Sequence, residues 1–367
     1  MNTCFAAVMP GPHRPVELRE LPLPELEQES ALLRVICSEV CGTDVHLREG
    51  QLAGVPYPII PGHVTVGVLE RIRGRLVDVD GEAFHEGDVV TFLDVHGTCH
   101  QCRACLIDKA STRCPNRKVY GITYGVEDGL TGGWSQYVYL KPGTRCIALG
   151  DVTPELFLAG GCSMPTTLHA VERADVSIGD TVLVLGAGPV GLSCVAFSLL
   201  RGAGAVLCTG APRHRLDVAR AIGAADCLDI TGVTEIERRA WVMDRTRGRG
   251  ADVTIEATGV AAAVVQAMRW TRDAGRVVVV GQYTDAGEVP FNPHTDLNRK
   301  HLDVRGCWGS DYSHFHRSVR LLDSRIARAM WSQFTLSRYE LKDANQALGD
   351  VATGKTVKAL ILPPPAG

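Results

Sequence analysis

The chain has 367 residues, which is longer than one ordinary hydrophobic core and predicts two domains. Hydrophobic residues make up 45% of it, charged residues 22%, and the formal net charge is -3, which excludes a strongly basic surface for nucleic acid or anionic lipid. No basic region followed by an apolar stretch opens the chain, so we expect no secretory signal. Thirteen cysteines, an odd number, then favour reduced thiols and metal ligands in a cytoplasmic protein over disulfides.

The first part of the chain, to about residue 155, is expected to be a β-rich domain. Short runs of apolar and β-branched residues alternate with turns that contain Gly and Pro, and helical periodicity is weak. Strands are predicted at 31–37, 64–72 and 88–93. The long segments between such strands are expected to be functional loops.

One of these loops contains a C-x2-C-x2-C-x8-C run, formed by Cys99, Cys102, Cys105 and Cys114. Disulfides between such close neighbours would be strained, and a cytoplasmic location disfavours them. Four thiolates can instead close a tetrahedral cage around one zinc with no open position, which is typical of a structural site. His96 and His100 could compete as ligands, but thiolates are the softer donors. The run therefore predicts a structural zinc.

Beyond Cys162 strands alternate with helices, which predicts a doubly wound parallel sheet. Strands are expected at 182–185, 205–208, 226–228, 253–256, 276–280 and 304–307, and a helix at 213–222. The uncharged stretch 181–200 is as long as a membrane span, but its central glycines and proline favour a buried strand, a tight turn and a buried helix. After about residue 295 the pattern is mixed, and the tail 363–367 is expected to fray.

A glycine-rich turn joins the first strand and the first helix of this second half. It matches G-x-G-x-x-G and contains Gly186, Gly188, Pro189, Val190 and Gly191. The first glycine permits the turn, the second lets a pyrophosphate approach the backbone, and the third lets helix and strand pack closely. The helix N-terminus adds free N–H groups and a positive dipole end. A glycine turn that binds no nucleotide fits this context less well, so we predict a dinucleotide site, which is also expected to include Gly281.

The end of the second strand in this half bears on the choice of cofactor. NAD specificity calls for an Asp or Glu about 20 residues after the glycine turn, and 209–211 contains neither. The turn continues instead through Gly210 to Arg213 and Arg215, which suits the 2′-phosphate of NADP(H) better than a 2′-hydroxyl. The alternative is that both arginines only decorate the first turn of a surface helix. The sequence thus favours NADP(H) over NAD(H), and a single position decides between them.

Further candidate metal ligands are spread along the chain. The run CGTDVH at 41–46 contains a thiolate, a hydroxyl, a carboxylate and an imidazole within six residues. His63 follows a Pro-rich loop, and Cys162 precedes an expected helix. Two thiolates and an imidazole can hold a zinc by three ligands and leave one position open for chemistry. Taken singly, each residue is more often structural, since a lone Cys is commonly a small buried hydrophobe.

Together these motifs resemble those of the zinc-dependent medium-chain dehydrogenase/reductases, relatives of alcohol, sorbitol and threonine dehydrogenases. The resemblance covers nearly the whole chain and is carried by CGTDVH at 41–46, GH at 62–63, the cysteine run at 99–114, GGWSQYV at 132–138, the segment 162–170 and GAGPVG at 186–191. It implies an α/β protein with a GroES-like, β-rich catalytic domain at 1–155 and 296–367. A Rossmann domain with a doubly wound parallel sheet is then inserted at 156–295.

The resemblance also implies roles for individual residues. The ligands of a catalytic zinc are implied at Cys41, His63 and Cys162, so that the chain would bind two zincs in all. Thr43 resembles the hydroxyl that passes the substrate proton onward, and His46 resembles the outer end of that relay. Asp44 resembles the carboxylate that orients His63, a role with its own physical basis.

The sequence departs from the family's pattern at three points. Val64 stands where a Glu usually follows the ligand histidine, which removes a carboxylate expected near the metal and puts in doubt any ligand exchange that depends on it. The last cysteine spacing is x8 where x7 is commoner, which slightly lengthens a loop. The acid at the end of the second strand is missing, as noted for the cofactor.

The implied activity is hydride transfer between a nicotinamide cofactor and a secondary alcohol or ketone, with zinc as the Lewis acid. Polar residues that could line the substrate pocket are Asp94, His96, Trp308, Asp311, Tyr312, His314 and His316. Such walls suit a polyol, cyclitol, sugar or amino alcohol, although solvated loop residues would give the same pattern. Alternatives are a zinc-independent reductase of activated double bonds or quinones on the same fold, and a non-catalytic binding protein derived from it. By resemblance, a homodimer or homotetramer with a small-molecule substrate and no nucleic-acid or membrane partner is expected.

Overall fold

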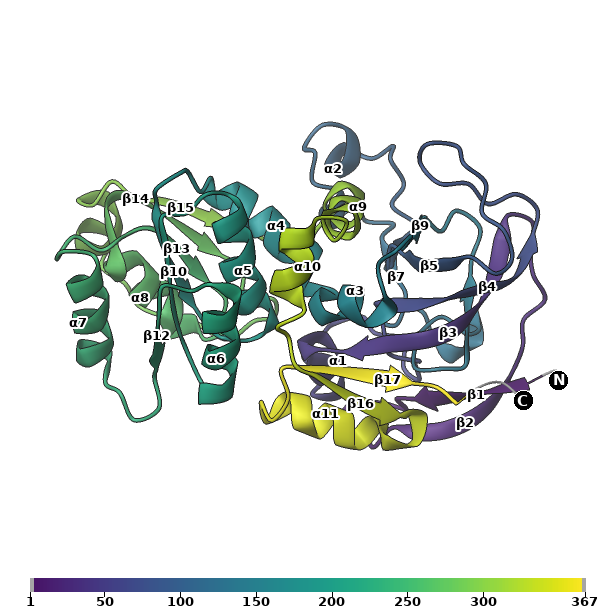
Figure 1. Cartoon of the computed structure of the whole chain (residues 1–367). Coiled ribbons are helices and arrows are strands. Elements are labelled where there is room, and N and C mark those ends of the chain that lie inside the picture. Colours follow the sequence, from purple (N-terminus) through teal and green to yellow (C-terminus); the bar gives the residue numbers. More distant parts are fainter. Residues whose placement is uncertain (1–2, 365–367) are drawn as a thin grey trace. The chain divides into compact units, whose positions relative to one another are not determined.

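The computed structural model describes residues 3–364, so that 365–367 of the tail expected to fray lie outside the described residues. The chain forms two compact units (Figure 1). Unit 1 comprises Met1–Cys162, Asp311–Asp323 and Thr335–Gly367, and unit 2 comprises Ser163–Ser310 and Ser324–Phe334. The expected division into a β-rich part and a doubly wound α/β part is confirmed as a fold class.

Unit 1 contains most of the strands. They are β1 (Thr3–Val8), β2 (Glu17–Pro22), β3 (Ser30–Val40), β4 (Thr65–Arg73), β5 (Val89–Phe92), β6 (Val95–His96), β7 (Lys118–Val119), β8 (Tyr137–Leu140), β9 (Cys146–Ala148), β16 (Leu336–Glu340) and β17 (Lys358–Leu362). Its helices are α1 (Gly42–Arg48), α2 (Arg103–Leu106), α3 (Pro154–Gly160), α9 (Tyr312–Leu321) and α11 (Ala344–Ala352), with short 3-10 turns η1 (Ser111–Arg113), η2 (Val126–Asp128) and η4 (Leu341–Asp343).

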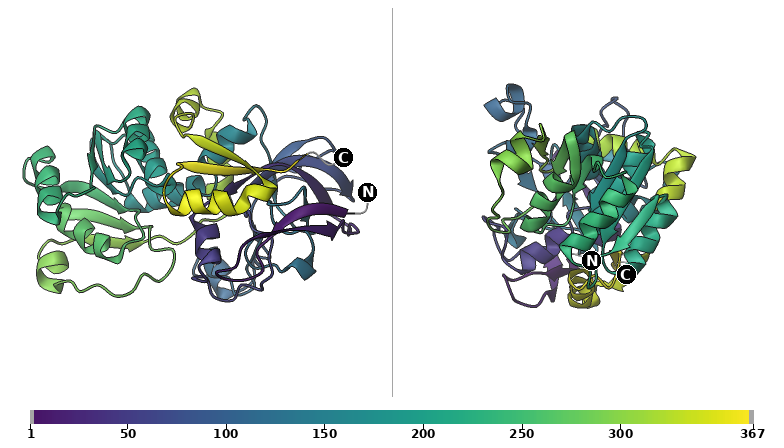
Figure 2. Two further views of the ribbon diagram at one scale, coloured as in Figure 1. Left: turned by 90° about the horizontal axis from the view of Figure 1, so that it is seen from below. Right: turned by 90° about the vertical axis from the view of Figure 1, so that its left-hand side faces the viewer.

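The main sheet of unit 1 has the order β16-β17-β3-β4-β5-β9, and β8 also pairs with β3. Strand β3 is antiparallel to each of its partners, and its last residues lie opposite β17 from the C-terminal end of the chain. Figure 2 shows α11 lying along β16 and β17, with which it packs. The end of β3, where the candidate site begins, is therefore held by segments far apart in sequence.

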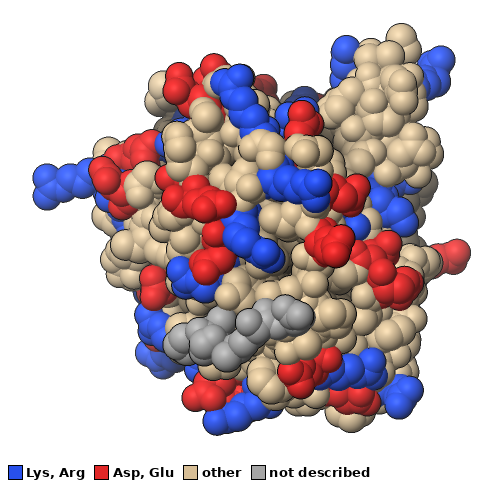
Figure 3. All heavy atoms as spheres, turned by 90° about the vertical axis from the view of Figure 1, so that its right-hand side faces the viewer, with Lys and Arg blue, Asp and Glu red and all other residues tan. Residues whose placement is uncertain are grey.

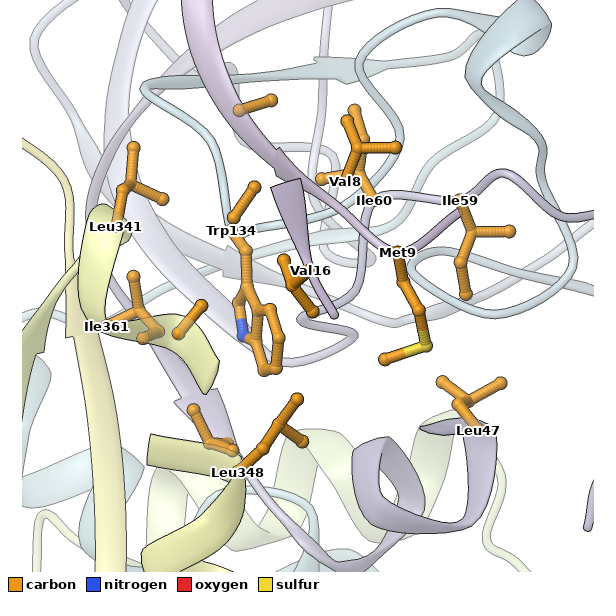
Figure 4. Close-up of a cluster of buried hydrophobic side chains, with 14 of the residues drawn as sticks. Val8, Met9, Val16, Leu47, Ile59, Ile60, Trp134, Leu341, Leu348 and Ile361 are labelled. Carbon is orange, nitrogen blue, oxygen red and sulfur yellow. The ribbon is translucent and has the colours of Figure 1, made fainter. Parts of the chain in front are cut away.

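A hydrophobic core of unit 1 fixes that same region (Figure 4). Leu47 of α1 and the indole of Trp134 are fully buried in it, beside Ile361 of β17. Trp134 Nε1 donates a hydrogen bond to the backbone oxygen of Glu39 at 3.0 Å. Because close-packed cores resist displacement, the end of β3 and the start of α1 have well-defined positions.

Unit 2 is a six-stranded parallel sheet of order β12-β11-β10-β13-β14-β15 with helices on its faces. Its strands are β10 (Thr181–Leu185), β11 (Ala205–Gly210), β12 (Asp226–Asp229), β13 (Ala251–Glu256), β14 (Thr271–Val279) and β15 (Asp303–Gly306). Its helices are α4 (Ser163–Ala174), α5 (Pro189–Leu200), α6 (Arg213–Ile222), α7 (Glu235–Arg245), α8 (Ala261–Trp270) and α10 (Arg325–Trp331), with a π-helical turn η3 (Pro293–Asn298). Helix α5 packs against α4 and α6, and α7 packs against α8.

The division between the units falls beyond the boundaries expected at 155 and 295, because unit 1 runs to Cys162 and unit 2 runs to Ser310. Helix α3 packs on β3 and β4 and belongs to unit 1. Strand β15 pairs with β14 and belongs to unit 2, while α9 returns to unit 1. The sequence after residue 295 shows no clear strand or helix pattern, so it could not predict these contacts.

The predicted elements of unit 2 agree closely with the structure. The helix predicted at 213–222 is α6, and the uncharged stretch 181–200 is β10, the glycine turn and α5. Strand β14 begins at Thr271, five residues before its predicted start. Among residues 3–364, no helix combines the length and apolar character needed to cross a membrane. On the face of unit 1 drawn in Figure 3, acidic and basic side chains are interspersed, in line with the near-neutral composition.

Candidate metal and cofactor sites

The four cysteines of the 99–114 run lie together in the loop of unit 1 that carries α2 and η1. Sγ of Cys102 is 3.5 Å from that of Cys105, and Sγ of Cys114 is 3.5 Å from that of Cys99 and 4.0 Å from that of Cys102. A tetrahedral zinc with Zn–S bonds of about 2.3 Å requires sulfur atoms about 3.8 Å apart. The backbone N–H of Gln101 also lowers the pKa of Cys99 to about 6, which favours the thiolate that metal binding needs. Donor chemistry and spacing both fit a zinc.

A second group of possible ligands forms where three segments of unit 1 meet. Cys41 follows β3, His63 lies just before β4, and Cys162 ends the loop after α3. Cys41 Sγ, a ring nitrogen of His63, Cys162 Sγ and a carboxylate oxygen of Glu39 all lie within 4.8 Å of one another. Cys41 Sγ and His63 Nε2 are 3.9 Å apart. The structure thus brings together the three residues expected as ligands and adds a carboxylate that the sequence analysis did not single out.

Local structure fixes the position of the Cys41 thiol. Cys41 is the N-cap of α1, and its sulfur accepts a hydrogen bond from Thr43 N at 3.3 Å. The thiol of Cys162 and the positive charge of His63 lower the pKa of Cys41 well below its usual value, against the effect of burial. The hydrogen bond between the thiols of Cys41 and Cys162, together with burial, raises the pKa of Cys162. One thiolate is therefore favoured before any metal binds, and metal binding would release the remaining proton.

Asp44 acts on the backbone of this site. Its carboxylate accepts hydrogen bonds from the backbone N–H of Cys41 at 2.8 Å and of Gly62 at 3.5 Å, so that it ties together the two segments that carry Cys41 and His63. The buried Nδ1 of His63 has no hydrogen-bond partner among the described residues. The hydrogen bonds that Asp44 accepts come from main-chain N–H groups and hold the two loops together, and its role in orienting the His63 ring stays a prediction. Burial raises the pKa of Asp44.

Thr43 and His46 lie one turn apart on α1, so their side chains share a face of that helix. Thr43 is half-buried, in the first turn beside Cys41. His46 is half-buried as well, and its Nδ1 is hydrogen-bonded to the side chain of Gln51, which is exposed. The pair therefore leads from the neighbourhood of the Cys41 thiol toward solvent.

Glu39 and Lys358 form a buried ion pair beside the same group. The side chains are 0% and 1% exposed, and Lys358 Nζ is 2.6 Å from Glu39 Oε2. Burial disfavours the charged amine, but the Glu39 carboxylate together with the charges of the Cys162 and Cys41 thiolates outweighs burial and raises the pKa of Lys358 above its usual value. In the sequence each residue is only a charge near the end of a mostly apolar strand, and such a charge is more often placed on an exposed strand face.

The glycine-rich turn of unit 2 opens a cleft of about 490 Å³ at the carboxyl end of the parallel strands. Gly186 and Gly188 line it, and Pro189 and Val190 form the first turn of α5. A Cβ on Gly191 would lie 1.8 Å from the oxygen of Gly186, so only glycine allows α5 to approach the turn this closely. Since β10 lies between β11 and β13, the turn stands where the strand order reverses, which is the place for a dinucleotide in such sheets.

The far end of the cleft contains the residues that bear on the cofactor's ribose. Gly210 at the end of β11, Arg215 of α6 and Arg238 of α7 line it. Arg213 is exposed and is not among the residues that line the cleft. It lies close enough to the carboxylate of Asp229 to interact with it electrostatically. Gly281, expected in the same site, donates a backbone hydrogen bond to Glu256 O at 3.0 Å beyond the end of β14. The sequence analysis missed Arg238 because α7 follows β12, two strands after the β10 strand that leads into the glycine-rich turn.

Comparison with known proteins identifies the family. Residues 27–151 match the alcohol dehydrogenase GroES-like domain, and residues 189–324 match the zinc-binding dehydrogenase family. The 5-exo-hydroxycamphor dehydrogenase of Pseudomonas putida is 31% identical over 98% of this chain and 99% of that protein. A probable alcohol dehydrogenase of Mycobacterium tuberculosis is 34% identical over 87% of each chain. The chain belongs to the zinc-binding alcohol dehydrogenase family.

A solved structure supports the same assignment. An alcohol dehydrogenase from Thermotoga maritima has a TM-score of 0.92 and 32% identity, with 99% of this chain and 100% of that chain covered. The fold class and the family expected from the sequence are thus confirmed. The chain is accordingly an oxidoreductase of the alcohol dehydrogenase type.

The polar residues expected around the substrate of this dehydrogenase are distributed over both units. Burial raises the pKa of Asp94, which lies close enough to His63 to feel its charge. His96 is hydrogen-bonded to the Tyr124 hydroxyl and to Pro142 O at 3.0 Å. Of the later group, Asp311 caps α9 and pairs with His314 at 2.8 Å, so these two are satisfied locally.

Trp308 belongs to unit 2, whereas Asp311, Tyr312, His314 and His316 belong to unit 1. The Trp308 ring stacks on Tyr283, with ring centroids 5.8 Å apart. Tyr312 lies against His316, also with centroids 5.8 Å apart. Within unit 1, Asp94 is the member of the predicted set that is electrostatically coupled to a candidate metal ligand of this dehydrogenase.

Proposed function

We propose that the chain is a zinc-dependent dehydrogenase that transfers a hydride between NADP(H) and a secondary alcohol or its ketone. In this proposal Cys41, His63 and Cys162 hold a catalytic zinc, and the four cysteines at 99–114 hold a structural one. The observation that carries it is the convergence of two thiols and an imidazole, from three separate segments, within 4.8 Å. The unit that contains them is the catalytic domain, and unit 2 is the cofactor domain.

A zinc held by two thiolates and one imidazole would supply Lewis acidity that makes an alcohol ionisable near neutral pH. The protein's own part is to move the proton and to hold the geometry. The Thr43 hydroxyl accepts the substrate proton and passes it along α1 to His46, whose ring reaches solvent through Gln51. Asp44 keeps the Cys41 and His63 loops in register through their backbone N–H groups.

The cofactor preference is proposed as NADP(H) over NAD(H). Strand β11 has no carboxylate of its own at its end, and the neighbouring Asp229 of β12 is not among the residues that line the cleft. Arg215 and Arg238 line it there. Guanidinium groups bind phosphate oxygens by charge-assisted hydrogen bonds. These arginines therefore favour a cofactor with a 2′-phosphate.

The substrate class is proposed from the relatives and from the polar residues of unit 1. The relatives named above and a 27% identical D-arabinitol dehydrogenase 1 from Uromyces fabae carry names that refer to alcohols, two of them cyclic or polyhydric. Asp94 adds a half-buried carboxyl group near His63. A secondary alcohol with further polar groups, such as a polyol, cyclitol, sugar or amino alcohol, fits this environment best.

Assembly as a homodimer or homotetramer is also proposed. Strand β15 is an edge strand of the unit 2 sheet, and Val304 in it is 40% exposed. An edge strand with free backbone groups can pair with its copy across a two-fold axis. Light scattering coupled to gel filtration would give the state directly, and a monomer at all concentrations would contradict this proposal.

A substrate panel tests the proposed function. Metal-replete protein is assayed with alcohols and ketones, each with NAD(H) and NADP(H), by nicotinamide absorbance. We expect turnover of secondary alcohols with NADP(H). Reduction of activated double bonds by protein with one zinc per chain would support the zinc-independent reductase instead. Absence of any absorbance change across the panel would support a non-catalytic binding protein.

A further inference from the structure

The carboxylate of Glu39 stands where it could complete a closed metal site. It is fully buried, and one of its oxygens belongs to the group of ligand atoms that lie within 4.8 Å of one another with those of Cys41, His63 and Cys162. Oε1 is 3.7 Å from His63 Nε2. Two thiolates, an imidazole and a carboxylate would satisfy four-coordinate zinc and leave no position for substrate. The question is what keeps this carboxylate off the metal.

Hydrogen bonds from protein donors to both oxygens of Glu39 keep the carboxylate away from the metal position. Oε2 accepts from Lys358 Nζ at 2.6 Å, and the backbone N–H of Cys162 lies 3.1 Å from Oε2 and 3.2 Å from Oε1. Lys358 Nζ also donates to Gly160 O at 3.3 Å. The ammonium group is therefore tied both to the carboxylate and to the loop that carries Cys162.

The backbone around Glu39 is shaped to receive the carboxylate. Gly161 has φ of +50°, and a Cβ on it would lie 1.7 Å from Glu39 Oε2 and 2.9 Å from Lys358 Nζ. Only glycine lets the 160–162 loop wrap this closely around the ion pair. Strand β17 brings Lys358 to this place through its pairing with the end of β3, in which Leu360 lies opposite Glu39.

A buried carboxylate that loses its cation has a strong need for another one. Removing one partner of a buried ion pair leaves an uncompensated charge, which is strongly unfavourable. His63 lies 3.7 Å from Glu39 Oε1, but a metal ligand must be a neutral imidazole, so the nearest alternative cation for Glu39 would then be the metal held by the neighbouring thiols and imidazole. Val64, immediately after His63, is buried and apolar, so the position next to this histidine supplies no carboxylate. The carboxylate of the group comes instead from Glu39, near the end of β3.

We propose that Lys358 is a positioning residue that keeps the Glu39 carboxylate hydrogen-bonded to protein donors. The fourth position of a metal at this site would then stay open to substrate. Loss of the lysine would let Glu39 bind the metal and close the site. The inference rests on the proposed function, because it presupposes a metal at Cys41, His63 and Cys162.

Cobalt-substituted protein tests the proposal without relying on turnover. Co(II) is exchanged for zinc, and imidazole is added as an external ligand while the visible cobalt spectrum is recorded. Only a site with an open position changes its spectrum, so the four-cysteine site does not interfere. We compare the wild type with Lys358→Met, Glu39→Gln and the double variant, and use Lys358→Arg as the charge-conserving control.

The wild type, Lys358→Arg and Glu39→Gln are expected to show the imidazole-dependent change at similar concentrations. Lys358→Met is expected to lose it or to need about tenfold more imidazole, because a tethered carboxylate competes at high effective concentration. The double variant is expected to regain the response. An unchanged imidazole affinity in Lys358→Met would overturn the proposal.

A wild type that does not respond, beside a Glu39→Gln variant that does, would show that Glu39 is a permanent ligand and would also overturn it. This comparison decides the matter even if Lys358→Met does not fold. Failure of the proposed function has a different signature: only one cobalt per chain would bind in every variant, and none would respond to imidazole.

Discussion

The four-cysteine cluster and the group formed by Cys41, His63 and Cys162 lie in the same unit of this dehydrogenase but are built in opposite ways. The cluster takes its ligands from one partly exposed loop of sixteen residues, 99–114, with little regular structure. The second group takes its ligands from the end of β3, the segment before β4 and the loop after α3, and Cys41 and His63 in it are buried. A metal in the cluster would order its own loop, whereas the scaffold of the second group is already ordered by the core.

The difference between the two sites lies in their remaining contacts. Sulfur atoms surround the cluster's centre and leave no place for another ligand. Beside the second group stands a carboxylate held by Lys358, so its fourth donor is present but engaged elsewhere. We therefore expect substitutions of the ligands in the second group to abolish activity without a large change in the stability of the protein. Substitutions in the cluster should first disorder the 99–114 loop.

The largest effect is expected from His63→Ala. Without the imidazole the proposed catalytic zinc is lost or misplaced, and since metal polarisation is worth several kcal/mol, kcat/KM should fall by about a thousandfold or more. NADPH binding, followed by fluorescence, and the thermal unfolding midpoint should change little. His85→Ala, at an exposed histidine, is the matched control. A His63→Ala enzyme with wild-type kcat/KM would remove His63 from the site.

Next in size is the effect of Cys102→Ser on the cluster. Structural zinc contributes on the order of 10 kcal/mol of apparent binding free energy in zinc-finger peptides, so its loss should unfold the loop locally. Thermolysin should then cut near Leu106 and Ile107, which are 50% and 66% exposed. Arg103→Ala, in the same loop, should leave zinc content and protease resistance unchanged. Equal resistance in Cys102→Ser would mean that the loop is ordered without a metal.

A smaller effect is expected from Thr43→Val, which keeps the shape of the side chain but removes the hydroxyl. Proton transfer by a positioned group typically contributes about a hundredfold or more, so kcat should fall by that order. Thr43→Ser should retain most of the activity. Steady-state kinetics at saturating cofactor provides the measurement, and a Thr43→Val variant that turns over like the wild type would exclude the relay.

The smallest effect concerns the cofactor cleft. Arg215→Ala and Arg238→Ala each remove a guanidinium group from its lining, and a lost charge-assisted hydrogen bond should weaken NADPH binding by about tenfold. NADH binding should change much less. Arg213→Ala is the comparison, because its exposed side chain is not part of the lining. Equal losses for NADPH and NADH in titration calorimetry would contradict a 2′-phosphate site.

The two candidate metal sites also differ in how far the sequence could predict them. Cysteine spacing alone predicted the cluster, because all its ligands lie in one short loop. For Cys41, His63 and Cys162 the residues taken singly were ambiguous, and only the family resemblance joined them. Glu39 and Lys358 escaped prediction because their meeting depends on the pairing of β17 with β3 and on burial, neither of which is visible in local sequence. Arg238 was missed for the same reason, since α7 reaches the cleft only through the fold of unit 2.

The zinc content of purified protein shows whether both groups of ligands bind a metal. Plasma emission spectrometry on the wild type, on Cys41→Ala/His63→Ala and on Cys99→Ser/Cys102→Ser separates the two sites. We expect two zincs per chain in the wild type and one in each double variant. One zinc in the wild type, unchanged in Cys41→Ala/His63→Ala, would show that the two thiols and the imidazole do not hold a metal.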